Sequence, residues 1–324
     1  MRKKRNIFVA GHTGMVGSAI VRQLCRIGLA DQLVVRTHAE LDLVRQDEVE
    51  RFFQQSRPTH VFLAAAKVGG ILANSSHPAE FSFVNLQIAT NVIDASWKTG
   101  VRKLMFLSSS CVYPREAPQP MKESYLWTGR LEPSNEAYAV AKLAGMSMCA
   151  AYRTQYGCDF IAVIPPNLYG PSDNYDAQSS HLVAALIRKL HDAVVQELPE
   201  IHLWGTGTPR REVMFVDDLA EALIFLMDYS GPDPINIGVG EDWPVSELAA
   251  LVADIVGFKG RIRFDPSKPD GAPRKLLDVA RLRELGWSSK ISIRNGLTMT
   301  YDDFRRSFDN TTQRSWSQTG RGEP

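Results

Sequence analysis

Apolar residues in the first half of the chain alternate between short continuous runs and longer stretches with helical spacing. The short runs have the length and content of strands that are buried on both faces of a parallel sheet. They cover residues 6–10, 33–35, 60–66, 103–107 and 159–165. The longer stretches place apolar residues three or four positions apart, as the buried face of an amphipathic helix does. They cover residues 15–29, 47–55, 79–98 and 136–155. This alternation predicts an α/β fold with a doubly wound, mainly parallel, Rossmann-like sheet that carries helices on both faces.

The alternation breaks after Pro166, which predicts a second, smaller α/β lobe made from discontinuous segments. A helix is expected at about residues 181–196, after a stretch rich in loop-forming residues. Residues 213–237 return to the apolar spacing of the first half and are expected to rejoin it. The predicted division is a first domain of residues 1–166 joined by about 210–240, a lobe of 167–209 and 241–310, and a disordered polar tail at 311–324.

Composition and charge exclude several classes of partner. The chain has 324 residues, 44% of them hydrophobic, which is enough for one large domain or two interlocked ones. Its net charge of +1 predicts no nucleic-acid partner, and no apolar run approaches the length of a membrane span. Four cysteines, at positions 25, 111, 149 and 158, show neither C-x-x-C nor zinc-ligand spacing, so no metal is expected. Scattered free cysteines, and an apolar stretch at residues 7–10 that is too short for a signal peptide, predict a cytoplasmic protein.

A glycine-rich turn joins the first predicted strand to the first predicted helix. Gly11, Gly14 and Gly17 stand in the spacing G-x-x-G-x-x-G. Without Cβ atoms the chain turns tightly and approaches a pyrophosphate closely, while the start of the helix offers free N–H groups. An ordinary strand-to-helix turn can show the same spacing. This motif alone therefore leaves both a dinucleotide site and a plain turn open.

Two further strand ends indicate which dinucleotide would bind. Arg36 follows the second predicted strand, where an acidic residue would bind the ribose hydroxyl of NAD and an Arg accommodates the 2′-phosphate of NADP. We therefore predict NADP, with a solvated surface arginine as the plainer alternative. Asp42 is placed to reach the adenine ring. Ala64, Ala65 and Ala66 offer small side chains where a ring system would lie flat.

Three polar residues have the chemistry of a carbonyl reductase. Tyr138 and Lys142 stand four residues apart in one predicted helix, and Ser109 follows the fourth predicted strand. A Tyr hydroxyl has an unperturbed pKa of about 10, so it needs a cationic neighbour, which Lys142 supplies one turn along the helix. Ser109 would be a second donor to the substrate oxygen. A core aromatic and a solvated lysine are the commoner fates of each residue alone, but both together beside a dinucleotide site favour catalysis.

In this order and context, the glycine turn, Ser109 and Tyr138-x-x-x-Lys142 resemble the extended short-chain dehydrogenase/reductase family. Longer segments narrow the resemblance to the GDP-L-fucose synthase branch of that family. These segments are residues 64–70, 109–114, 166–171 and 269–278. The resemblance extends over almost the whole chain, from residue 6 to about residue 310.

The resemblance implies an enzyme that epimerises carbons 3 and 5 of GDP-4-keto-6-deoxy-D-mannose and then reduces the 4-ketone with NADPH. Ser109, Tyr138 and Lys142 correspond to the reductase residues, and Cys111 and His181 to the acid/base pair of epimerisation. A thiol and an imidazole titrate close enough to neutrality to take a proton from one face and return one to the other. Without the resemblance, a buried core thiol is the commoner explanation of Cys111, and helix capping or packing is the commoner explanation of His181.

The resemblance also assigns binding residues and an assembly. The cofactor is expected to contact Gly11, Thr13, Gly14, Met15, Val16, Gly17, Arg36, Asp42, Leu43, Ala64, Ala65, Ala66, Lys142, Pro165, Asn167, Leu168 and His181. The GDP-sugar is expected to contact Lys189, Trp204, Arg211 and Lys275. Some members carry Arg where this chain has Thr13, so Arg36 alone would select NADP. Helices 79–98 and 136–155 are expected to pair across a two-fold axis in a homodimer.

Two other functions stay open at this point. A related sugar-nucleotide 4-epimerase or simple 4-reductase would keep Tyr138 and Lys142 but would not need Cys111 and His181. A non-catalytic NADP-binding sensor on the same fold would be expected to lose Tyr138 or Lys142, and this chain keeps both.

Overall fold

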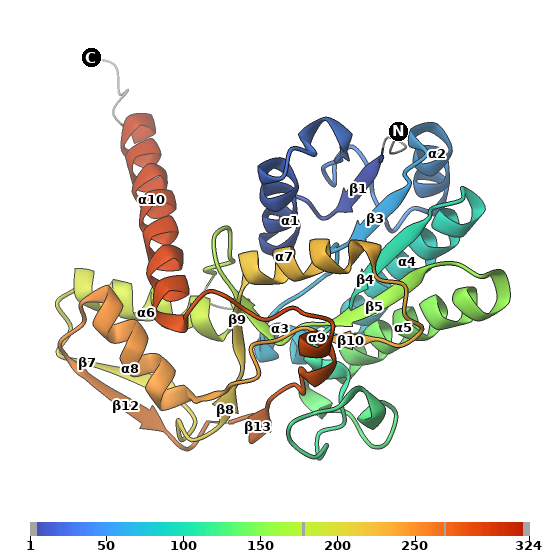
Figure 1. The fold of residues 1–324 in the computed structure, drawn as a ribbon. Helices are drawn as coiled ribbons and strands as arrows, with labels where there is room; N and C mark the ends of the chain where they lie inside the picture. The colour runs from blue at the N-terminus through green and yellow to red at the C-terminus, as the bar shows by residue number, and fades with distance from the viewer. Residues whose placement is uncertain (1–4, 177–178, 269, 320–324) are drawn as a thin grey trace.

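A six-stranded sheet forms the centre of the protein, with the strand order β10-β5-β4-β3-β1-β2 (Figure 1). All of its neighbouring strands run parallel. The strands are β1 (Ile7–Ala10), β2 (Leu33–Val34), β3 (His60–Leu63), β4 (Lys103–Leu107), β5 (Phe160–Ile164) and β10 (Ile235–Asn236). The computed structural model describes residues 5–176, 179–268 and 270–319. The predicted doubly wound parallel sheet is confirmed.

Side chains alternate between the two faces of this sheet, and each face has its own apolar core. In β1, Ile7 and Val9 pack on one face, whereas Phe8 and Ala10 pack on the other. This is the period of two that a pleated strand imposes, and both faces are apolar because helices cover both. One face is covered by α1 (Met15–Arg26) and α7 (Val216–Phe225), and the other by α2 (Gln46–Ser56), α4 (Pro78–Lys98) and α5 (Glu136–Tyr156) (Figure 1).

A third apolar core lies in the smaller lobe, beside the sheet (Figure 1). Its helices are α6 (Leu182–Val195), α8 (Val245–Val256) and α10 (Ile293–Thr319), and its strands are β7 (Glu200–Trp204), β12 (Arg261–Asp265), β6 (Asn167–Tyr169) and β9 (Val213–Phe215). Three short strands connect this lobe to the sheet: β8 (Arg210–Arg211), β11 (Trp243–Pro244) and β13 (Arg274–Lys275). Two further short helices are α3 (Ile71–Ser76) and α9 (Ala280–Glu284).

The two predicted domains are interleaved along the chain, and their boundaries stay a prediction. Leu277 and Val279 pack in one sheet-face core, and Leu282 and Trp287 pack in the other. The segment that carries them was assigned to the smaller lobe from the sequence. Its side chains instead belong to the cores of the parallel sheet.

The C-terminal segment differs from the expected disordered tail. Helix α10 continues to Thr319, and residues 320–324 lie outside the described residues. Polar composition suggested disorder, but no Gly or Pro stands between Leu297 and Thr319 to end the helix. Within the part of the chain that the structure describes, no helix is both long and apolar enough to cross a membrane.

Candidate active site

The glycine turn lies where the strand order changes direction, between β1 and β3. Gly11 has a φ of +83°, and a Cβ there would come within 2.8 Å of the Ala65 backbone nitrogen. A Cβ on Gly17 would come within 2.0 Å of the Gly11 carbonyl oxygen. Only glycine therefore fits at these two positions, and the turn lies against the ends of β3 at Ala64–Ala66. Ligands of doubly wound sheets bind at such a switch point.

The start of α1 has the features of a phosphate-binding site. Gly14 is the N-cap residue, no side chain caps the helix, and its first turn contains no acidic residue. Thr13 and Gly14 are exposed, while Met15 and Val16 are half-buried against the sheet. The free N–H groups of this first turn carry a partial positive charge and suit a pyrophosphate. These residues fit a dinucleotide, as the sequence predicts.

Arg36 lies two residues beyond the end of β2 and is exposed. Its Nη1 donates a 2.7 Å hydrogen bond to the Val35 carbonyl, and its guanidinium lies 5.6 Å from the centre of the Phe52 ring. No carboxylate forms an ion pair with it among the residues that the structure describes. The guanidinium is therefore available to an added phosphate.

Asp42 and Leu43 lie in a turn beside this strand end. The Asp42 carboxylate accepts a 3.0 Å hydrogen bond from the Val44 N–H, and Asn91 donates to the Leu43 carbonyl at 3.0 Å. The Asp42 side chain therefore has its own local partner in this turn. Its contact with adenine stays a prediction.

Strand β5 and the residues after it approach the same edge of the sheet. The Pro165 carbonyl accepts a 2.9 Å hydrogen bond from the Ser110 N–H, which ties the end of β5 to the turn after β4. Asn167 and Leu168 lie in β6 and pair with β9. Pro165 thus lies beside the turn that contains Ser109 and Ser110. Asn167 and Leu168 begin the connection to the smaller lobe.

Ser109, Tyr138 and Lys142 come together at this edge. Ser109 lies two residues after the end of β4 and caps the short helix Ser110–Val112. Tyr138 and Lys142 share one face of α5. Burial raises the pKa of Tyr138, the neighbouring Cys111 raises it further, and a hydrogen bond with Ser109 opposes both effects. Lys142 is buried, donates to the Leu107 carbonyl at 2.8 Å, and lies 5.7 Å from the centre of the Tyr138 ring. Burial lowers the pKa of Lys142 to about 8.

Cys111 has two polar neighbours that come from distant parts of the chain. Asn135, the N-cap residue of α5, donates from Nδ2 to the Cys111 sulfur at 3.0 Å, and its Oδ1 is buried without a partner. Lys275 Nζ lies 3.7 Å from the same sulfur. An amide donor and an ammonium group therefore both contact the sulfur of Cys111. The sequence analysis missed Asn135, because Pro-Ser-Asn before a helix is read as an ordinary helix start.

Short strands β8 and β13 explain why Lys275 reaches this position. They run parallel, with Arg211 opposite Lys275 and Arg210 opposite Arg274. Because neighbouring residues of a strand point to opposite faces, the pair Arg210 and Arg274 lies on one face and the pair Arg211 and Lys275 on the other. Arg210 and Arg274 both bind the buried carboxylate of Asp242. Arg211 and Lys275 are left on the face toward Cys111.

The other residues predicted to bind the GDP-sugar are Lys189, Trp204 and Arg211. Lys189 donates to the His202 carbonyl, and Trp204 is 59% exposed at the end of β7. Arg211 donates to the Asp270 carbonyl at 3.3 Å, and Lys268 lies 5.8 Å from the centre of the Trp204 ring. One cluster of side chains therefore contains Trp204, Lys268, Asp270 and Arg211. Their contact with a substrate stays a prediction.

His181 lies at the start of α6, next to a segment that contacts Gly70. It is the N-cap residue of α6 through its backbone, and burial lowers the pKa of its imidazole, which favours the neutral form. The preceding Ser179 carbonyl accepts a 3.1 Å hydrogen bond from the Gly70 N–H. The segment after Gly70 leads to Phe81, whose ring lies 6.4 Å from that of Tyr138. Among the described residues, no hydrogen bond joins His181 to Cys111.

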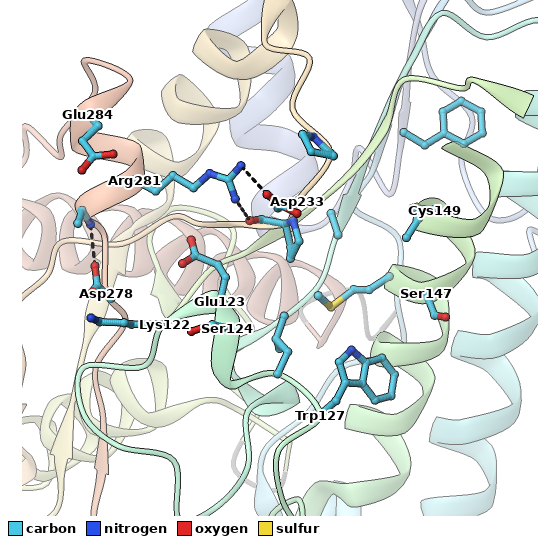
Figure 2. Close-up of a pocket in the computed structure, with 18 residues that line it drawn as sticks. Lys122, Glu123, Ser124, Trp127, Ser147, Cys149, Asp233, Asp278, Arg281 and Glu284 are labelled. Atoms are coloured by element: carbon cyan, nitrogen blue, oxygen red, sulfur yellow. Dashed lines mark hydrogen bonds and ion pairs between the residues drawn. The ribbon is translucent and has the colours of Figure 1, made fainter. Parts of the chain in front are cut away.

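A separate cavity of about 910 Å³ lies beside α5, away from these residues (Figure 2). Trp127, Cys149 and Arg281 are among the residues that line it, and Arg281 forms an ion pair with Asp233 at 3.2 Å. None of the predicted site residues lines this cavity. It is therefore distinct from the candidate active site.

Known proteins resemble this chain over nearly its full length. The model of the NAD dependent epimerase/dehydratase family matches residues 7–238. A GDP-L-fucose synthase from Arabidopsis thaliana is 54% identical over 95% of each chain, and one from Escherichia coli is 49% identical over 94% of this chain and 98% of the other. A crystal structure of a GDP-L-fucose synthetase from Naegleria fowleri bound to NADP is 27% identical, with a TM-score of 0.88 over 95% of this chain and 96% of the other. The chain therefore belongs to the GDP-L-fucose synthase family, within the NAD dependent epimerase/dehydratase family.

Proposed function

We propose that the protein epimerises carbons 3 and 5 of GDP-4-keto-6-deoxy-D-mannose and reduces the 4-ketone with NADPH, which yields GDP-L-fucose. The observation that carries this proposal is the position of Cys111. The thiol lies between the reductase residue Tyr138 and the cation Lys275. These contacts support one site that contains the groups for proton exchange and for reduction.

The reductase half needs a proton donor for the ketone oxygen. When bound, NADPH supplies a hydride to carbon 4. Tyr138 donates its hydroxyl proton to the oxygen, and its raised pKa means that the hydroxyl carries this proton at neutral pH. Ser109 donates a second hydrogen bond to the same oxygen, and Lys142 stabilises the tyrosinate that forms.

The epimerase half needs one group on each face of the sugar. Each carbon that is inverted lies beside the ketone, so its hydrogen is removable once the enolate oxygen is stabilised. We assign the stabilisation of that oxygen to Ser109. Cys111, with Asn135 and Lys275 beside its sulfur, acts as one acid/base group. His181, whose imidazole is held neutral by burial, acts as the other.

We also propose a homodimer formed by α4 and α5. Phe83 on α4 is 59% exposed, and Val140 on α5 is 45% exposed. At the far ends of the same helices, Trp97 stacks on Tyr156 at 4.2 Å, and Tyr156 is 43% exposed. Exposed apolar groups at both ends of one helix pair favour an antiparallel pairing with a second copy.

The working compartment and the division of labour between the lobes are part of the same proposal. We place the reaction in the cytoplasm, where the four free cysteines would stay reduced. The sheet domain holds NADPH, and the smaller lobe holds the GDP moiety through Lys189, Trp204, Arg211 and Lys275.

The test is to incubate the purified protein with NADPH and GDP-4-keto-6-deoxy-D-mannose and to determine the product stereochemistry by NMR. GDP-L-fucose is expected. A product inverted at neither carbon 3 nor carbon 5 would indicate a simple 4-reductase. Exchange of sugar hydrogens with no consumption of NADPH would indicate an epimerase, and no reaction with tight NADPH binding would indicate a sensor.

A further inference from the structure

We propose that Glu212 is a positioning residue that holds Lys275 against the Cys111 thiol. Glu212 directly follows Arg211, and it is only 1% exposed. No cation forms an ion pair with it among the described residues. A charged group this deeply buried is costly unless other groups compensate it.

Backbone N–H groups provide part of that compensation, and burial still raises the pKa of Glu212 to about 7. Glu212 Oε1 accepts hydrogen bonds from the N–H groups of Val239 at 2.7 Å and Gly240 at 2.8 Å. Its Oε2 accepts one from the Leu277 N–H at 2.8 Å. A Cβ on Gly238 would come within 2.3 Å of Oε1, so the absence of a side chain at 238 leaves room for this carboxylate.

One side chain therefore joins three separate segments of the chain. The Glu212 N–H also donates to the Lys275 carbonyl at 3.1 Å. Glu212 therefore forms hydrogen bonds with the β13 segment at two residues, Lys275 and Leu277. The turn at 239–240 follows β10 of the central sheet, whereas β13 belongs to the three short strands that connect the lobes. Glu212 thus sets the position of the strand that carries Lys275 relative to the sheet that carries Cys111.

This geometry predicts that Glu212 acts on Cys111 only through Lys275. A cation beside a cysteine sulfur is typical of cysteines that react readily with alkylating agents. Weakening the Glu212 contacts lets β13 shift, the ammonium moves away, and the thiol becomes less reactive. The role in catalysis rests on the proposed function, but the thiol reactivity can be measured without any substrate.

The test compares variants of the intact protein by their rate of alkylation with iodoacetamide at pH 7, with Cys111 resolved from the other cysteines by peptide mass spectrometry. Lys275→Met is expected to slow alkylation of Cys111 about tenfold. Glu212→Gln has the same size but presents an NH₂ group to at least one backbone donor, so it is expected to slow alkylation several-fold. The double variant Glu212→Gln/Lys275→Met is expected to be no slower than Lys275→Met alone, because the two residues act in series.

Asp218→Asn is the matched control. Asp218 is also buried and also accepts two backbone hydrogen bonds, from the N–H groups of Lys290 at 3.0 Å and Ile291 at 2.9 Å, in a part of the fold distant from Cys111. It is expected to lose stability as Glu212→Gln does, with unchanged alkylation of Cys111. Gly238→Ala, which crowds the Glu212 carboxylate, is a milder variant for use if Glu212→Gln does not fold.

Several results would overturn the proposal. They are wild-type alkylation of Cys111 in Glu212→Gln and Gly238→Ala, wild-type alkylation in Lys275→Met, or a double variant slower than Lys275→Met. If alkylation follows the proposal but no GDP-L-fucose forms, the proposed function fails and the positioning role stands. If GDP-L-fucose forms and alkylation does not follow the proposal, only the positioning role fails.

Discussion

Lys142 donates a 2.8 Å hydrogen bond to the carbonyl of Leu107, the last residue of β4. The lysine is 4% exposed, and no carboxylate binds it among the described residues. Its ammonium lies 5.0 Å from the centre of the Phe106 ring and 5.7 Å from that of Tyr138. A buried cation with so few compensating groups costs stability, and its position beside Tyr138 gives the reason for keeping it.

Replacing Lys142 should therefore stabilise the protein while it abolishes reduction. We expect Lys142→Met to raise the free energy of unfolding at pH 7 by about 1–3 kcal/mol. Burial lowers the pKa of Lys142 to about 8, so the unfolded chain binds this proton more tightly than the folded protein does. The cost is thus present at pH 7 and disappears as the pH rises from about 8 toward the unperturbed value of about 10.4.

Urea unfolding of both proteins at pH 7 and pH 10.5 measures this difference. The stability gain of Lys142→Met should be large at pH 7 and nearly absent at pH 10.5. A variant that is less stable than the wild type at pH 7 would show that Lys142 is a stabilising element of the core.

Arg36→Asp should reverse or erase a preference for NADPH over NADH. The guanidinium has no carboxylate partner among the residues that the structure describes, and we expect it to bind the 2′-phosphate. An aspartate there would repel the phosphate and accept a ribose hydroxyl. The measurement is the ratio of kcat/KM for the two cofactors. Arg51→Asp, an exposed change of equal charge on α2, is the control and should leave the ratio unchanged.

An unchanged ratio in Arg36→Asp would mean that another cation selects the cofactor. Lys67, near the end of β3, is the next cation along this edge of the sheet. It is already paired with Glu80 at 2.5 Å, which makes it a weaker selector than Arg36.

Val140→Asp should disrupt the proposed dimer. The change puts a charge into the exposed apolar face of α5, where it would be buried opposite a second copy. Light scattering at micromolar concentration should give a dimer for the wild type and a monomer for the variant. Val195→Asp, at a 67% exposed position of α6 in the other lobe, should stay dimeric. A monomeric wild type would contradict the assembly.

The sequence predicted the sheet well because its signal is local. Strands buried on both faces read as continuous apolar runs, and the glycine turn can be recognised without any distant contact. The end of α10 was not predicted for a related reason: polar composition alone does not separate a polar helix from a disordered tail.

The surroundings of Cys111 could not be predicted from the sequence, because they depend on contacts between distant residues. Asn135 is 24 positions from Cys111, and Lys275 is 164 positions away. The side of β13 on which Lys275 lies depends on the register between β8 and β13. Each of these strands has two residues, which is too short to show a period in the sequence. Glu212 lies beside two arginines and reads as a surface residue, although the fold buries it.

Proton exchange and reduction are expected to be separable reactions of one site, and two variants test this. Tyr138→Phe removes the proton donor for the ketone oxygen, so reduction should collapse while proton exchange beside the ketone continues. Cys111→Ser removes one acid/base group, which typically costs ~10²–10⁴-fold in rate, so exchange should slow by that order.

The decisive measurement is deuterium incorporation at carbons 3 and 5 of the keto-sugar by NMR in heavy water, alongside NADPH consumption. The account predicts that Tyr138→Phe still incorporates deuterium but consumes almost no NADPH, and that Cys111→Ser incorporates deuterium far more slowly than the wild type. Exchange at the wild-type rate in Cys111→Ser, or normal NADPH consumption in Tyr138→Phe, would contradict it.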